Sequence, residues 1–330
     1  MTNSTYDVLA VGNALVDVIT TAEPSFLDTH AIPKGTMRLI AADEAERLYG
    51  IMGAGKEVSG GSAANTVAGI AAMGGRPAFV GRVAADQLGE VFAHDIRAAG
   101  VAFSTPAMVD GPPTGRCLIV VTPDGDRTMS TYLGACQELS EADIDPEVVR
   151  ASQILYLEGY LWDPVVPRAA MRKAIEIARG AGRKVAFTLS DVFCVEGHRD
   201  DFLGLLAGHV DVMFGNENEV RALYRTDDLD TAMTELARHA TIAVVTRSDK
   251  GAVVIAGGER HAVPAEPVAR VVDTTGAGDL FAAGFLSALA AGRALPDCAR
   301  AGGVAAAEII SHYGARSEGD LAALVAARLG

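Results

Sequence analysis

The sequence predicts an α/β protein built on a doubly wound, mostly parallel sheet. Short apolar segments bounded by Gly or Asp recur along the chain, and they have the length of buried parallel strands. Segments with helical periodicity lie between them, which is the order of repeated β-α-β units. The expected strands lie at 6–13, 77–83, 154–160, 184–191, 210–217 and 241–249.

The intervening helices complete a single domain that spans residues 1–330. They are expected at 63–74, 88–100, 167–182, 218–224, 279–292, 295–311 and 317–329. Two segments, 14–41 and 112–134, do not fit the alternation. Asp124-Gly125 in the second is a strong signal for a tight hairpin turn. We therefore expect a small antiparallel β lid beside the parallel sheet, formed by these two discontinuous segments.

Composition argues against several classes of protein. The chain has 330 residues, 49% of them hydrophobic, and a net charge of −14 without a basic patch, so a nucleic-acid partner is not expected. No apolar run of about 20 residues is present, so no membrane partner is expected either. The four cysteines lack CxxC spacing, which favours reduced core residues in a cytoplasmic protein. Monomer and homodimer both stay open.

Polar side chains gather where the predicted strands end. Ligands of doubly wound sheets bind beyond the carboxyl ends of the strands. The residues that fall at these positions include Asn13, Asp17, Asn216, Glu219, Thr246, Ser248 and Asp279. A structural cap explains any one of them, whereas their concentration at one edge favours a binding site for a small molecule.

The stretch "VVDTTGAGDLFAAGF" (271–285) predicts an anion site. A short strand at 270–272 is expected to end at Asp273, and Gly276, Ala277 and Gly278 lead into a helix that is small or apolar on every face. Such a helix is buried, and its free N-terminal N–H groups attract an anion such as phosphate. A carboxylate beside a bound phosphate is repelled by it, so Asp279 is a candidate base that deprotonates an attacking hydroxyl. The alternative is an ordinary capping aspartate.

A second glycine-rich stretch, "EVSGGSAANTVAGIAAMGG" (57–75), offers a place for the hydroxyl donor. Gly60 and Gly61 precede a helix of small residues with Asn65 in its first turn. Asn is a poor helix former, and its amide can both donate to and accept from a polyol. A tight turn with the amide satisfied by backbone is the alternative. The neighbouring "GIMGAGKE" (50–57) is rejected as a P-loop, because Glu57 stands where Ser or Thr is needed.

These stretches together resemble the ribokinase-like (PfkB) carbohydrate kinase family over nearly the whole chain. "DTTGAGDLFAAGF" and "GGSAANTV" are similar to its two signatures. The resemblance implies transfer of the γ-phosphoryl group of ATP to a primary hydroxyl, with Asp279 as base and the N–H groups of residues 276–279 as anion hole. "FGNENE" resembles the Asn-x-x-Glu element that organises Mg²⁺ and phosphates, here Asn216 and Glu219. Further positions that the resemblance assigns to ATP are Thr246, Ser248, Gly251 and Thr275.

Within that family the chain is most similar to the adenosine kinases. "VGNALVDV" resembles their opening element, with Asn13 and Asp17 on the ribose hydroxyls, and "DRTMSTYLGAC" resembles their lid strand. This implies that Arg127 reaches the transferred phosphate and that Met129, on the same strand face, meets the base. Phe193 is implied as a pocket aromatic. Trp162 is expected either to stack on a purine or to pack in the core.

The sequence leaves the acceptor open. Thr275 is shared with sugar kinases, and Asp191-Val192 replaces the small residue and proline that usually precede the pocket aromatic. A kinase of ribose or fructose, a kinase of guanosine or inosine, and a non-catalytic nucleoside sensor are the alternatives to an adenosine kinase. The resemblance also suggests a monovalent cation such as K⁺ near Asp273, Thr275 and the loop at 312–316. No zinc motif is found among the seven histidines.

Overall fold

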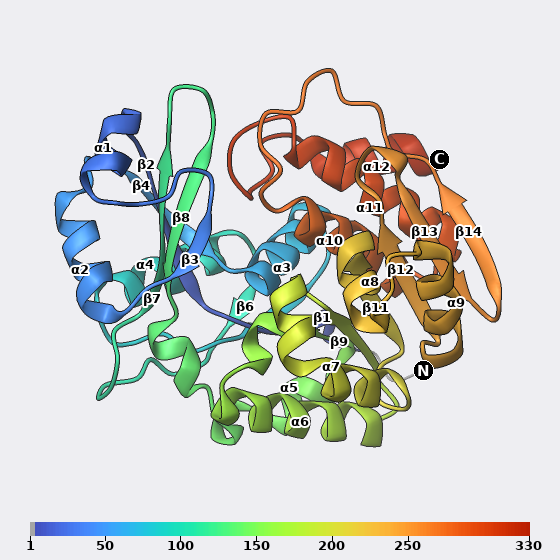
Figure 1. Cartoon of the computed structure of the whole chain (residues 1–330). Helices are drawn as coiled ribbons and strands as arrows, with labels where there is room; N and C mark the ends of the chain where they lie inside the picture. The colour runs from blue at the N-terminus through green and yellow to red at the C-terminus, as the bar shows by residue number, and fades with distance from the viewer. Residues whose placement is uncertain (1–3) are drawn as a thin grey trace.

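The computed structural model describes residues 4–330 and consists of two β-sheets with helices around the larger one (Figure 1). The larger sheet has nine strands in the order β14-β13-β12-β11-β10-β9-β1-β5-β6. All neighbouring pairs from β12 to β6 are parallel, and β13 and β14 add an antiparallel hairpin at one edge. The predicted fold class is therefore confirmed.

Six of the nine strands of the larger sheet lie close to the predicted segments, whereas the strands at 102–103, 252–256 and 259–263 were not predicted. They are β1 (Tyr6–Val11), β5 (Pro77–Val80), β6 (Ala102–Phe103), β9 (Ser152–Glu158), β10 (Lys184–Thr188), β11 (Val212–Asn216), β12 (Ile242–Thr246), β13 (Ala252–Ala256) and β14 (Glu259–Val263). Successive residues of β1 enter different cores, with Val8 and Ala10 on one face of the sheet and Leu9 and Val11 on the other. Both faces are thus covered, as the uninterrupted apolar strands predict.

Helices occupy both faces. One face carries α3 (Ser62–Ala72), α4 (Gln87–Ala98), α10 (Ala277–Ala290), α11 (Leu295–Ile309) and α12 (Leu321–Leu329). The other carries α5 (Pro146–Arg150), α6 (Val165–Gly180), α7 (Val192–Leu206), α8 (Glu217–Tyr224) and α9 (Leu229–His239). Helix α10 lies against the sheet, α3 and α11 (Figure 1). Gly284 permits this approach, since a Cβ there would lie 2.4 Å from the Ala301 carbonyl oxygen.

The smaller sheet forms the lid. Its order is β3-β8-β7-β2-β4, from strands β2 (Leu15–Thr21), β3 (Met37–Leu39), β4 (Lys56–Gly60), β7 (Gly115–Val121) and β8 (Arg127–Tyr132). Two short helices, α1 (Pro24–Thr29) and α2 (Ala42–Ile51), accompany it. The predicted hairpin is confirmed, because β7 and β8 pair antiparallel around a turn in which Gly125 has φ +84°.

Two predictions about these regions need correction. The lid is a mixed sheet rather than an antiparallel one, because β2 pairs parallel with β7 and β3 with β8, and it includes a third segment, β4. The expected strand at 270–272 is absent from the structure. The Val272 N–H instead donates to the Ile310 carbonyl at 2.8 Å, at the end of α11, so no neighbouring strand is paired there. Within residues 4–330, no helix combines the length and apolarity needed to cross a bilayer.

Candidate active site

A cavity of about 540 Å³ lies between the lid and the carboxyl ends of the strands of the larger sheet. Lid strands β2, β3, β7 and β8 supply one wall, and the loops after β1, β9, β10, β11 and β12 and the start of α10 supply the other. The cavity-lining residues that the sequence predicted are Asn13, Asp17, Gly61, Asn65, Met129, Phe193, Asn216, Glu219, Thr246 and Thr275–Asp279. Most of the predicted polar residues are therefore gathered in one place.

The beginning of α10 presents free N–H groups to this cavity. Gly276 is the N-cap and has φ +77°, and a Cβ there would lie 2.9 Å from Ala315 Cβ, so glycine is required. The N–H of Ala277 donates to the Thr274 carbonyl at 3.2 Å. Within residues 4–330 no acceptor is found for the N–H groups of Gly278 and Asp279, and a Cβ on Gly278 would meet nothing within 4 Å. The two N–H groups, at the positive end of the helix, are a candidate anion site.

Asp279, the third residue of α10, is fixed by two side chains from the first turn of α3. Ser62 Oγ donates to its Oδ1 at 2.6 Å, and Asn65 Nδ2 donates to its Oδ2 at 2.9 Å. Burial raises the pKa of Asp279, and these hydrogen bonds and Arg316 oppose the rise. Each carboxylate oxygen keeps a further lone pair, so Asp279 can accept a proton from a hydroxyl in the cavity.

Asn65 supports Asp279 rather than standing free for a polyol. Its Oδ1 accepts a hydrogen bond from the Arg316 guanidinium, which also donates to Ser59 Oγ at 2.9 Å. With the oxygen engaged, the Asn65 amide group turns its nitrogen to Asp279. Arg316 was not predicted to have this role, because its loop carries no helical or strand periodicity that would place it beside α3.

Asp17 faces the cavity from lid strand β2. Burial raises its pKa from 3.8 to about 6, while Arg316 and Arg127 lower it and Asp279 raises it. A Cβ on Gly60 would lie 2.4 Å from the Asp17 carboxylate, so the neighbouring strand must carry glycine. Gly60 therefore makes room for Asp17 and does not itself line the cavity.

Glu158, at the end of β9, is a cavity-lining residue that the sequence analysis missed. It is 0% exposed, and its Oε1 accepts from Asn13 N at 2.8 Å and from Asn13 Nδ2 at 2.6 Å. Its Oε2 accepts from Ala63 N at 2.7 Å. Burial raises the pKa of Glu158 to about 7 against these hydrogen bonds. The sequence did contain a signal for Glu158, because it is a charged residue at the end of an otherwise apolar strand.

Arg127, at the start of β8, joins the lid to the loop before α10. Its NH1 lies 2.9 Å from Asp273 Oδ2 and donates to Thr275 Oγ1 at 3.0 Å, and both charged side chains are less than a tenth exposed. Its Nε has no partner within residues 4–330. A guanidinium beside the anion site is in a position to meet a phosphate group.

The expected K⁺ does not fit at Asp273. Its Oδ1 accepts from Thr275 N at 3.0 Å, and its Oδ2 accepts from Gly314 N at 2.9 Å in addition to the contact with Arg127. Three of the four lone-pair positions of the carboxylate are thereby used, and the adjacent guanidinium would repel a second cation. Arg127 supplies the positive charge that the ion would bring.

Asn216 and Glu219 form a capping box at the start of α8. Asn216 Oδ1 accepts from Asn218 N at 2.9 Å and Glu219 N at 3.0 Å, and Glu219 Oε2 accepts from Asn216 N at 2.9 Å. Burial raises the pKa of Glu219 to about 7. The capping box accounts for the Asn-x-x-Glu spacing, and both residues also line the cavity.

The cavity lining also includes apolar side chains. Phe193, in the first turn of α7, is 44% exposed and packs against Tyr160 with 5.9 Å between ring centroids. Met37 and Leu39 of β3 are also exposed, and with Met129 they line the same cavity from the lid. Exposed apolar side chains on facing walls are what a flat apolar group would cover.

Three predicted site residues lie elsewhere. Trp162 is fully buried, its Nε1 donates to Asp201 at 3.0 Å, and its ring packs on Phe187 and Phe202 in the core. The core alternative is therefore correct for Trp162. Ser248 and Gly251 form the tight turn between β12 and β13, where the Gly251 N–H donates to the Ser248 carbonyl at 3.1 Å, and neither lines the cavity.

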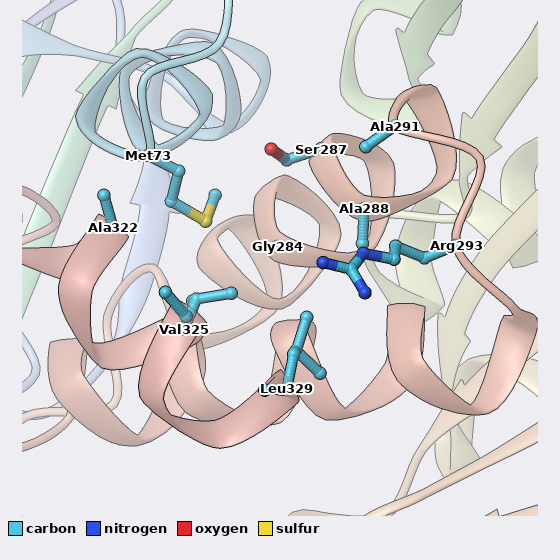
Figure 2. A pocket seen from close by; sticks show the side chains of 11 residues that line it. Met73, Gly284, Ser287, Ala288, Ala291, Arg293, Ala322, Val325 and Leu329 are labelled. Atoms are coloured by element: carbon cyan, nitrogen blue, oxygen red, sulfur yellow. The ribbon is translucent and has the colours of Figure 1, made fainter.

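A second hollow of about 220 Å³ lies beside α10 and α12 (Figure 2). Its walls are mostly small apolar side chains, with Ser287 and Arg293 as the polar exceptions. It contains no carboxylate side chain and none of the predicted site residues. The arrangement of acids, amides and a helix N-terminus that can carry chemistry is therefore found only in the larger of these two cavities.

Comparison with known proteins agrees with the fold. The family model of the pfkB family carbohydrate kinases matches residues 35–320. The chain therefore belongs to the PfkB family of carbohydrate kinases. It is a phosphotransferase with an alcohol group as acceptor.

Individual relatives carry two kinds of description. The adenosine kinase structure from Sinorhizobium meliloti is 52% identical with a TM-score of 0.91, over 98% of this chain and 99% of that one. A probable sugar kinase protein from Rhizobium etli CFN 42 is 48% identical with a TM-score of 0.92, over 99% of both chains. Adenosine kinase 1 of Arabidopsis thaliana is 28% identical over 95% of this chain and 97% of its own length.

Proposed function

We propose that this protein transfers the γ-phosphoryl group of ATP to the 5′-hydroxyl of adenosine and so forms AMP. One observation carries the choice of acceptor: the cavity lining combines oxygen acceptors with exposed apolar and aromatic side chains. Asp17, Asn13 and Asp279 offer oxygen acceptors, and Phe193 and the exposed side chains of β3 offer an apolar surface. A nucleoside has a vicinal diol and a flat base, and a free sugar has no group for the apolar surface.

The residues support a direct in-line transfer. Asp17 and the Asn13 amide oxygen hold the ribose diol, and Asp279 accepts the proton of the attacking hydroxyl. The new bond joins the hydroxyl oxygen to the γ-phosphorus, and the bond from that phosphorus to the β,γ-bridging oxygen breaks, so that ADP leaves. The N–H groups of Gly278 and Asp279 and the Arg127 guanidinium neutralise charge on the transferred group.

ATP and Mg²⁺ are the expected cosubstrate and cofactor. The N-terminus of α10 fits a phosphate, and Thr246 and Thr275 line the adjoining wall. Among residues 4–330 no group of three or more acidic, His or Cys side chains is spaced for a metal ion. Glu219 and Asn216, which line the cavity, would hold through water a Mg²⁺ ion that arrives with the phosphates, and the ion would supply positive charge to the transferred group.

The test is the initial rate of ADP formation with Mg·ATP and matched concentrations of adenosine, guanosine, inosine, ribose and fructose. We expect kcat/KM for adenosine to exceed that for each sugar at least about tenfold, or roughly 1.4 kcal/mol of transition-state binding. A higher value for guanosine or inosine would keep the nucleoside reading and change the base. A sugar at the top would contradict the proposal.

A sugar kinase is the second candidate, because the similar Rhizobium etli protein is described as a probable sugar kinase. Repeating the panel with Phe193→Ala separates the two. If a base packs on Phe193, KM for adenosine rises about tenfold or more, while KM for ATP stays within about twofold. An unchanged KM for adenosine would favour the sugar kinase.

A further inference from the structure

We infer that Glu158 is a positioning residue, which orients the acceptor-binding amide of Asn13 and the helix turn that holds Asp279. The inference rests on the proposed function for the roles of Asn13 in acceptor binding and of Asp279 as base, and not for the identity of the acceptor. Glu158 lies at the point where β1, β9 and α3 meet, and its carboxylate bonds to all three elements through the contacts described above. Among residues 4–330, no other side chain forms hydrogen bonds both to Asn13 and to the helix turn that holds Asp279.

The contact with Asn13 determines which end of the amide faces a ligand. Asn13 Nδ2 donates to Glu158 Oε1 at 2.6 Å, so the side chain cannot rotate by half a turn without placing its carbonyl oxygen against the carboxylate. Within residues 4–330 Asn13 Oδ1 accepts no hydrogen bond. The cavity therefore receives a fixed acceptor, which is the group that a ligand hydroxyl needs.

The contact with Ala63 fixes the first turn of α3. The N-cap of this helix is Gly61, which has no side-chain acceptor for the free N–H groups, and Glu158 Oε2 accepts from Ala63 N instead. A carboxylate at a helix N-terminus is favoured by the helix dipole. Ser62 and Asn65 of the same turn then hold Asp279 at 2.6 and 2.9 Å. Glu158 thus acts on the base through α3.

Close packing at Gly12 and Gly61 leaves no space for a different arrangement of β1 and α3 around Glu158. A Cβ on Gly12 would lie 2.8 Å from Glu158 Oε2 and 2.5 Å from Ala63 Cβ. A Cβ on Gly61 would lie 2.2 Å from the Asn13 carbonyl oxygen. The two glycines allow β1 and α3 to close around the carboxylate.

The test is Glu158→Gln, which keeps the size of the side chain but cannot satisfy all three donors. If its oxygen accepts from Asn13, its NH₂ group faces the Ala63 N–H, and the reverse orientation sets the NH₂ group against Asn13. We expect KM for the acceptor to rise about tenfold or more and kcat to fall, while KM for ATP stays within about twofold. The acceptor is whichever compound the unmodified enzyme phosphorylates best, so failure of the adenosine proposal leaves this test intact.

Asp86→Asn is the matched control. Asp86 also caps a helix and accepts three hydrogen bonds, but it does not line the cavity. Its donors are Gly89 N at 2.8 Å, Thr114 N at 2.8 Å and Thr114 Oγ1 at 2.6 Å. The variant Asp86→Asn should lower the melting temperature without changing the acceptor KM. If Glu158→Gln changes only the melting temperature, as Asp86→Asn does, Glu158 is merely structural and the inference is wrong.

A double-mutant cycle with Asn13→Ala gives the second readout. If Glu158 acts on the acceptor through Asn13, the double variant raises the acceptor KM no further than Asn13→Ala alone, within about twofold. Independent effects on KM, which multiply in the double variant, would contradict this route. The cycle remains informative if Glu158→Gln is less stable, because both KM values are measured on folded protein.

Discussion

Asp279 illustrates at the residue scale how position gives one carboxylate a chemical role. Asp279 is the third residue of α10, and Asp297 is the third residue of α11. Asp297 faces solvent and pairs with Arg300 at 2.7 Å, whereas Asp279 faces the cavity and is held by Ser62 and Asn65. The same helix position therefore carries an ordinary surface acid in one element and a candidate base in the other.

We expect Asp279→Asn to lower kcat about 10²–10⁴-fold, because the amide cannot accept the hydroxyl proton. The dissociation constant for the acceptor should change little, since the variant leaves Asn13 and Asp17 in place. Asp297→Asn is the control for changing an acid at this helix position and should leave kcat unchanged. Turnover by Asp279→Asn at the rate of the unmodified enzyme would exclude the proposed role.

Asp17 predicts a pH dependence of acceptor binding. Its pKa of about 6 means that it is ionised at pH 7 and mostly protonated at pH 5. The ionised form accepts hydrogen bonds from both hydroxyls of a diol, so acceptor binding is strongest above pH 6 and weakens as the pH falls through that value. We expect the acceptor KM to be about tenfold higher at pH 5 than at pH 7.

The variant Asp17→Asn checks the assignment. Its acceptor KM should be high at every pH, and the part of the rise centred near pH 6 should be absent. A rise of equal size and midpoint in the variant would assign it to another group. The melting temperature at each pH shows whether the protein is folded throughout the series.

At the scale of elements, the sequence predicted the regular parts well. Six of the nine strands of the larger sheet and most of its helices were predictable, because an uninterrupted apolar segment reflects burial on both faces and the helical period reflects burial on one face. The elements β6, β13, β14, α5, α7 and α9 were not predicted. Strand β4 was missed because "KEVSG" is short and partly polar. It pairs only at the edge of the lid, so its sequence lacks the apolar run that marks a buried strand.

The site was predictable where a residue type is unusual in its local element, and less so where long-range contacts decide. Asp279 and Asn65 stand out in helices of small residues, and both line the cavity. Arg316 and Glu158 were missed because their roles depend on partners more than 90 residues away in the sequence. For Trp162 the sequence left two alternatives open, and only the fold shows that the chain after its strand turns into the core.

At the scale of the whole molecule, Arg127 and Asp273 connect the lid to the loop before α10, beside the candidate anion site. The ion pair is 2.9 Å long, with 8% and 5% of the two side chains exposed. Two like unit charges at about 4 Å repel each other by roughly 4 kcal/mol at an effective dielectric constant of about 20, so the guanidinium offsets the attraction of Asp273 for a second cation. The protein itself thus supplies the charge at this junction.

We therefore predict that turnover does not depend on K⁺. Rates in KCl, NaCl and tetramethylammonium chloride of equal ionic strength should agree within about twofold, because Debye screening is then the same in all three. In Arg127→Ala the Asp273 carboxylate is free to bind an ion, so K⁺ should raise the melting temperature of that variant more than tetramethylammonium does. Lys34→Ala, which removes a lid cation paired with Asp124 away from the cavity, is the control and should show no such preference. Stimulation of the unmodified enzyme by K⁺ beyond about fivefold would contradict the prediction.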